Sequence, residues 1–150
     1  MKQTPDLQHI QEKMKAGTLT LKGFLGDDTR TLSDIIAADE LIVASRGLSH
    51  EQIAAKLADL TERGRDLMEG EVELDGRFRV SVRDDRGKLP SPWGDGRFEK
   101  GDTVLVELTT GRTWRWNQLT LHLVKNHGFY GGQGSDYRLD PQEMIALLGL

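Results

Sequence analysis

The sequence has 150 residues, of which 37% are hydrophobic and 29% are charged, as is typical of a soluble domain able to bury one core. The absence of cysteine excludes disulfides, cysteine-bound zinc, thiolate nucleophiles and iron–sulfur clusters. At a formal net charge of −4, the chain lacks the excess of lysine and arginine that general nucleic-acid binding requires.

No stretch approaches the roughly 18 consecutive apolar residues that a membrane span needs. The opening residues, MKQTPDLQHI, also lack the apolar centre of a secretory leader. We therefore expect a cytoplasmic protein without a membrane segment, folded as a single domain over residues 1–150.

The first half of the chain has the apolar spacing of three helices, over residues 5–15, 32–46 and 49–68. Each start carries good capping residues: Thr4 before Pro5, Thr31 or Ser33, and Ser49 with Gln52. Between the first two helices, residues 18–21 alternate in polarity and are compatible with a short strand.

The third helix opens with residues 48–57, which resemble the first helix of bacterial helix-turn-helix domains. That family continues with a turn and a recognition helix, whereas residues 58–63 simply extend the same helix. We therefore do not expect DNA binding.

One polar residue interrupts the apolar stripe of the second helix. An unpaired buried carboxylate is costly, so Asp39 is expected to have a specific hydrogen-bond partner. The alternatives are that the helix bends at this point or that Asp39 lies at the rim of the core. His127 is the odd polar residue on a later apolar stripe, and the two side chains are candidates to pair with each other.

From Glu71 the period changes from helical to alternating. Asp75-Gly76 and Thr110-Gly111 are hairpin signals, and each joins two alternating runs. Asp140 followed by Pro141 marks the start of a last helix. The pattern predicts an α+β fold: N-terminal helices on a C-terminal antiparallel meander of about four strands, with a short helix after the last strand and a C-terminal helix.

Three arginines of the first hairpin, Arg77, Arg79 and Arg83, alternate with its apolar residues. They should project from the sheet face that is turned away from the core, which is usually a solvated face. The alternative is that this row accepts an acidic ligand.

Between the two hairpins, residues 85–101 have no periodicity and predict a long loop, of the kind that often forms a lid or a binding loop. Trp93 and Arg97 lie on it. A tryptophan between Pro92 and Gly94 either anchors the loop on the core or forms part of a binding wall.

The stretch from Trp114 to Asp140 is the most unusual part of the chain, because an aromatic strand, a short helix and a glycine-rich segment follow one another. The helix should end at Gly128, since glycine readily adopts the left-handed conformation of a helix end. His122 and His127 are five positions apart and should diverge around this helix, so we expect no two-histidine metal site and no metal or other cofactor.

The segment 128–140 has three glycines in four positions, followed by Ser135, Asp136, Tyr137 and Arg138. Its backbone N–H groups can approach an anion, with the Arg138 guanidinium as a bidentate partner for phosphate or carboxylate. It does not match a P-loop or a dinucleotide-binding motif. The alternative is an irregular connection whose aromatic side chains pack on the core.

The motifs SPWGDG and HGFYGGQGSDYRLDP, together with the tryptophan-rich strand before the second motif, resemble a family of small bacterial cytosolic proteins. The resemblance covers mainly residues 91–141. It implies a bacterial cytoplasmic setting and carries no activity.

We hypothesise a binding module for a small anionic or nucleotide-like ligand, held between the 85–101 loop and the 128–140 segment. The residues expected to contact this ligand are Trp93, Arg97, Ser135, Tyr137 and Arg138. One alternative is a protein–protein adaptor that uses exposed aromatic residues as anchors. Another is an enzyme with His127 as its acid or base, so the sequence leaves catalysis open.

Overall fold

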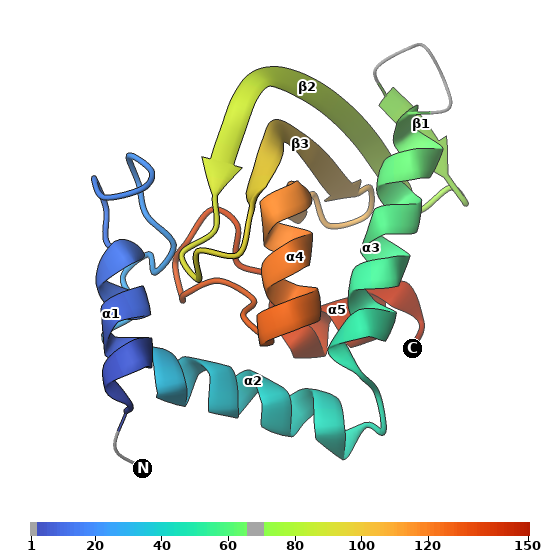
Figure 1. The fold of residues 1–150 in the computed structure, drawn as a ribbon. Coiled ribbons are helices and arrows are strands. Elements are labelled where there is room, and N and C mark those ends of the chain that lie inside the picture. Colours follow the sequence, from blue (N-terminus) through green and yellow to red (C-terminus); the bar gives the residue numbers. More distant parts are fainter. Residues whose placement is uncertain (1–2, 66–70) are drawn as a thin grey trace.

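The computed structural model describes residues 3–65 and 71–150 and has the predicted α+β architecture (Figure 1). The helices α1 (Pro5–Lys13), α2 (Leu32–Ser45) and α3 (His50–Arg65) come first. The strands β1 (Glu71–Leu74), β2 (Phe78–Pro90), β3 (Arg97–Glu107) and β4 (Thr113–Trp116) form an antiparallel sheet in chain order. The helices α4 (Gln118–His127) and α5 (Pro141–Leu148) complete the fold, so the predicted class and meander are confirmed.

Capping residues fix the helix boundaries. Side-chain oxygens of Thr4, Thr31 and Asp140 accept hydrogen bonds from the first turns of α1, α2 and α5. Gly128, with φ of 63°, ends α4 as predicted. The predicted end of the third helix at Met68 lies outside the described residues. None of the helices in the described segments is long and apolar enough to cross a bilayer.

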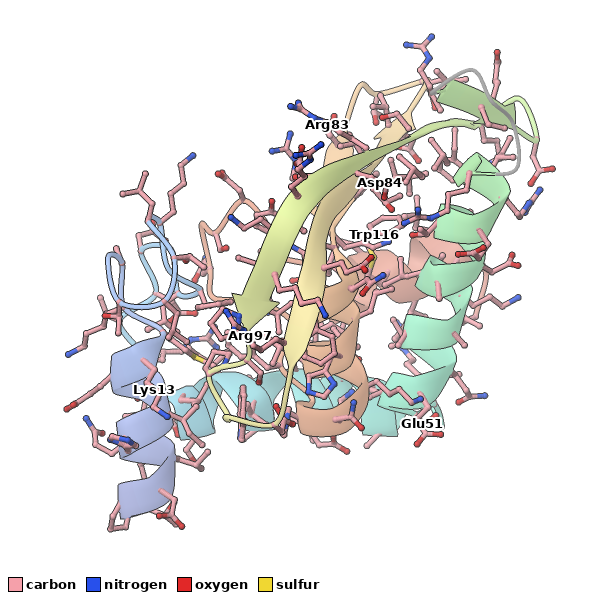
Figure 2. The ribbon with its side chains drawn as sticks, turned by 45° about the horizontal axis from the view of Figure 1, so that its top comes forward. Lys13, Glu51, Arg83, Asp84, Arg97 and Trp116 are labelled. Carbon is pink, nitrogen blue, oxygen red and sulfur yellow. The ribbon has the colours of Figure 1, made fainter. Side chains whose placement is uncertain are left out.

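Helices α3 and α4 pack on one face of the sheet, and the other face is solvated. The indole Nε1 of Trp116 donates to Thr61 Oγ1 at 2.8 Å, which ties β4 to α3. Figure 2 shows Trp116 on the helix side of the sheet and Arg83 on the other side. Arg77, Arg79 and Arg83 are all exposed, as predicted for the outer face.

Two apolar clusters share α4. The first lies between the sheet and helices α3 and α5, and includes Val124 of α4. The second lies around Leu119 and Leu123 of α4 and joins Met14, after α1, to Phe129. Because α4 contributes to both clusters, the residues that follow it are held between them.

The predicted 85–101 loop is wrong. β2 and β3 continue as a two-stranded arm, with Lys88 to Pro90 paired to Glu99 to Arg97, and only residues 91–96 form the connection. Figure 1 shows this arm curving over α4. The sequence pattern did not reveal these strands, because residues 83–88 are exposed on both faces of the arm. Such residues do not alternate between apolar and polar, which is the pattern that marks a half-buried strand.

The predicted strand over residues 18–21 is also wrong, because these residues form turns and bends. Gly17 N donates to Thr20 O at 2.8 Å, and Gly23 N donates to Thr20 Oγ1 at 2.9 Å. Phe24 N then donates to Met14 O at 2.9 Å, so the chain folds back onto the end of α1. The alternating threonine and leucine residues at positions 18–21 therefore form a compact hydrogen-bonded loop and not a strand.

Candidate functional site

A cavity of about 590 Å³ lies where four segments meet. Its walls are the loop after α1 (residues 20–26), the start of α4, the segment 129–137 and the arm formed by β2 and β3. This volume falls within the range of about 300–1,000 Å³ that is common for small-molecule sites. The two segments that the sequence pointed to, 85–101 and 128–140, therefore do meet at one cavity.

The glycine-rich segment builds the cavity by docking against the loop after α1. A Cβ atom on Gly132 would lie 2.2 Å from Leu25 O, and one on Gly26 would lie 2.3 Å from Ser135 N. Gly132 N donates to Phe24 O at 2.9 Å across the same contact. Only glycine allows two backbones to approach this closely.

The N–H groups of this segment are largely used within the protein. Gly132 N donates to Phe24 O, Gln133 N to Asp28 Oδ2 and Ser135 N to Gly132 O. They are therefore not available to surround a phosphate. The glycines serve close packing, which corresponds to the alternative interpretation of an irregular connection.

The interior of the cavity is apolar. It is lined by apolar side chains from all four segments: Phe24, Leu89, Leu119, Leu123 and Phe129. At its edge, Leu21 also lines the cavity although its side chain is 87% exposed. A large apolar side chain in this position extends the apolar surface outward to the solvent.

One end of the cavity is polar. Asn117 and Thr120 line it and are mutually bonded as the capping box of α4, through Asn117 Oδ1 and Thr120 Oγ1. Within the described part of the chain, Asn117 Nδ2 donates to no protein acceptor. Asp102 lies nearby because its neighbour Thr103 pairs with Trp116, the residue before Asn117.

Tyr137 completes this polar end. Its hydroxyl donates to Asp102, with distances of 2.9 and 2.8 Å to the two carboxylate oxygens. Burial, together with the Asp102 carboxylate, raises the pKa of Tyr137 to about 12. The phenol is therefore protonated at neutral pH and acts as a neutral hydrogen-bonding group.

The charged groups around the cavity do not favour an anion. Lys22 Nζ is 2.9 Å from Asp136 Oδ2, so these two exposed charges are paired. Across the whole lining there are three carboxylates and two ammonium groups: Asp85, Asp102, Asp136, Lys22 and Lys100. Their sum is negative, and the two lysines are the only cationic side chains among the described residues of the lining.

The structure separates the five residues that were predicted to contact a ligand. Ser135 and Tyr137 line the cavity, whereas Trp93, Arg97 and Arg138 are not among its lining residues. Arg97 is exposed near the tip of the arm (Figure 2). Trp93 is half-buried, with its ring stacked on His127 at 4.1 Å between centroids.

Arg138 is held in an ion pair with Asp39. Its Nη1 and Nη2 atoms lie 2.5 and 2.9 Å from the two Asp39 oxygens, and Nη1 also donates to Gly131 O at 3.0 Å. The prediction that Asp39 has a specific partner is confirmed, but its partner is not His127. His127 Nε2 instead lies 2.6 Å from Asp95 Oδ2.

Sequence reasoning missed Asp102 and Asn117 as cavity residues. The available signal for Asn117 was its spacing from Thr120, which is that of a helix cap. Nothing local marks Asp102, because its place at the cavity depends on the pairing of β3 with β4.

Comparison with known proteins gives no relative to guide the assignment: no protein-family model, no curated protein and no solved structure matches the chain. The resemblance to small bacterial cytosolic proteins therefore stays a prediction, and the proposals below rest on the geometry of the chain itself.

Proposed function

We propose that the protein binds a small amphipathic molecule in this cavity. The apolar body of the ligand lies against Leu89, Leu123 and Phe129, and its polar end lies toward Asn117, Asp102 and Tyr137. The observation that carries the proposal is the combination of an apolar interior with one polar end, where Asn117 Nδ2 has no acceptor among residues 3–65 and 71–150.

The polar end favours a ligand head group that is neutral or cationic. Asn117 Nδ2 can donate to a hydroxyl or carbonyl oxygen of the ligand. The Asp102 carboxylate accepts a hydrogen bond from Tyr137 and lies 3.9 Å from Arg115 Nε. The charged side chains that line the cavity still sum to a negative charge, which disfavours a ligand carboxylate or phosphate relative to a neutral or cationic group. The proposal therefore replaces the anionic ligand of the sequence-based hypothesis with an alcohol, amide or amine.

The adaptor hypothesis has less support. Every tryptophan, tyrosine and phenylalanine of the chain lies in the described segments, and none of them is exposed. Aromatic anchors that bind a partner protein need to be accessible before binding.

A fluorescence titration tests the proposal. N-phenyl-1-naphthylamine is a neutral apolar probe whose emission rises in an apolar site, and dodecanol, dodecylamine and dodecanoate share one chain but differ in head-group charge. We expect the probe to bind and to be displaced by dodecanol and dodecylamine. Dodecanoate should compete at least about ten-fold less well, since about 1.4 kcal/mol of repulsion has this effect.

Two exposed leucines provide matched variants. Leu21 lines the cavity and is 87% exposed, whereas Leu41 is 72% exposed on α2 and does not line it. Leu21→Ser should weaken dodecanol about five-fold, because a partly buried leucine contributes about 1 kcal/mol. Leu41→Ser should have no effect. Equal effects of the two variants, or tightest binding of dodecanoate, would contradict the proposal.

A further inference from the structure

A second group of side chains lies at the tip of the arm, outside the cavity. Asp95, from the connection between β2 and β3, meets His122 and His127 of α4. The Nε2 atoms of the two histidines lie 2.9 and 2.6 Å from the same oxygen, Asp95 Oδ2. One ligand atom from each residue lies within 4.8 Å of the other two.

The expectation that the two histidines diverge is therefore wrong. A separation of five positions does place them apart around the helix axis. The helical spacing leaves out the effect of the arm, which places the Asp95 carboxylate over α4. Both imidazoles point their Nε2 atoms at this carboxylate. Two aromatic side chains of the arm hold these rings: Trp93 stacks on His127 at 4.1 Å, and Phe98 packs on His122 at 4.3 Å.

We propose that Asp95, His122 and His127 form a binding site for a divalent transition-metal ion, with Zn²⁺ as the best match. Two imidazole nitrogens and one carboxylate oxygen suit Zn²⁺ and its neighbours in the first transition row, whereas Mg²⁺ and Ca²⁺ prefer oxygen ligands alone. Bonds of about 2.0–2.1 Å in a tetrahedral site place ligand atoms about 3.4 Å apart, so only small side-chain movements are needed.

The surroundings of the three residues support this site. The side chains of His122, His127 and Asp95 are 16, 18 and 36% exposed, so an ion can reach them while the rings stay oriented. Three protein ligands leave a fourth position for water or another small ligand.

Asn126 is the positioning residue of the site. Its Nδ2 atom lies 2.9 Å from His122 Nδ1 and 3.2 Å from His122 O. A histidine that binds metal through Nε2 carries its proton on Nδ1, so it needs an acceptor there. Rotation of the Asn126 amide supplies Oδ1 for this purpose. Asn126→Asp should therefore tighten Zn²⁺, and Asn126→Ala should weaken it about 10- to 100-fold.

Calorimetric titration of the metal-free, untagged protein with Zn²⁺ is the first test, and titration with Co²⁺ adds the visible absorption of a tetrahedral ion. One equivalent should bind to the parent. Asp95→Ala, His122→Ala and His127→Ala should each weaken binding by more than about 100-fold, a loss larger than that expected for Asn126→Ala. His9→Ala, on the exposed surface of α1, should bind like the parent.

A measurement on the parent protein avoids the risk that a variant fails to fold. Zn²⁺ should shift the imidazole NMR signals of His122 and His127 and leave those of His9 and His50 in place. Failure of the parent to bind Zn²⁺, or binding that His127→Ala leaves unchanged, would overturn the site. Neither outcome bears on the cavity, because Asp95, His122 and His127 do not line it.

Discussion

The ion pair between Asp39 and Arg138 gives the sharpest prediction about stability. The two side chains are only 3 and 18% exposed, and the guanidinium bonds both carboxylate oxygens in a bidentate arrangement. Arg138→Met removes the cation and leaves the Asp39 carboxylate buried without its partner. Breaking such a pair costs about 3–5 kcal/mol, out of the total of about 5–15 kcal/mol that stabilises an ordinary domain.

For a chain of this length, each kcal/mol lowers the melting temperature by about 2–4 °C. Arg138→Met should therefore melt about 6–20 °C below the parent. Arg138→Lys keeps the charge but loses the planar fork, and should cost about 1.5–3 kcal/mol. The double variant Asp39→Leu with Arg138→Met should recover much of the loss, since replacing both partners by apolar residues leaves no buried charge.

Urea unfolding followed by circular dichroism measures these differences, and exposed Arg97→Met is the matched control, expected within about 0.5 kcal/mol of the parent. Probe binding to folded Arg138→Met should be unchanged, because Arg138 does not line the cavity. If Arg138→Met unfolds at the same urea concentration as the parent, the ion pair does not stabilise the fold and the reasoning fails.

Two further predictions concern the contact that builds the cavity. Gly132→Ala places a Cβ 2.2 Å from Leu25 O, so it should lower the free energy of unfolding by about 1–3 kcal/mol and weaken probe binding. Urea unfolding and the fluorescence titration measure the two effects, and parent-like values in both would contradict the close packing. Asp28→Asn should destabilise the protein at pH 7. The hydrogen bond from Arg30 lowers the pKa of Asp28; desolvation opposes this shift, and the hydrogen bond from Gln133 N–H adds to it. The ionised carboxylate therefore stabilises the fold above about pH 4, and this stabilisation is lost as the pH falls through the lowered pKa. The gap between the urea midpoints of parent and variant should shrink from pH 7 to pH 3, and a constant gap would show that the carboxylate charge is irrelevant.

Local signals in the sequence were sufficient for most of the elements. Thr4, Thr31 and Asp140 marked helix starts because a capping side chain acts on the next few residues only. Asp75-Gly76 marked the first hairpin, and both residues have positive φ, as the turn requires. The arm was missed because strands that are exposed on both faces leave no apolar pattern to detect.

The arrangement of the candidate sites depended on contacts between distant residues. Asp39 was correctly marked as needing a partner, but the choice of Arg138 over His127 is fixed by how α2 packs near the segment after α4. Similarly, Asp95 reaches His122 and His127 only because β2 and β3 extend over α4. A helical wheel describes neither contact, since both join segments far apart in the chain.

The most direct test of the account is a map of ligand contacts on the folded protein. Titration of the ¹⁵N-labelled chain with dodecanol, followed by amide NMR, should shift signals from the walls of the cavity, including Phe24, Leu123 and Gly134, in a saturable way. Signals near Arg112 and Glu143, on a separate surface, should stay in place. Shifts centred on that surface, or no saturable shift at all, would contradict the assignment of the cavity as the ligand site.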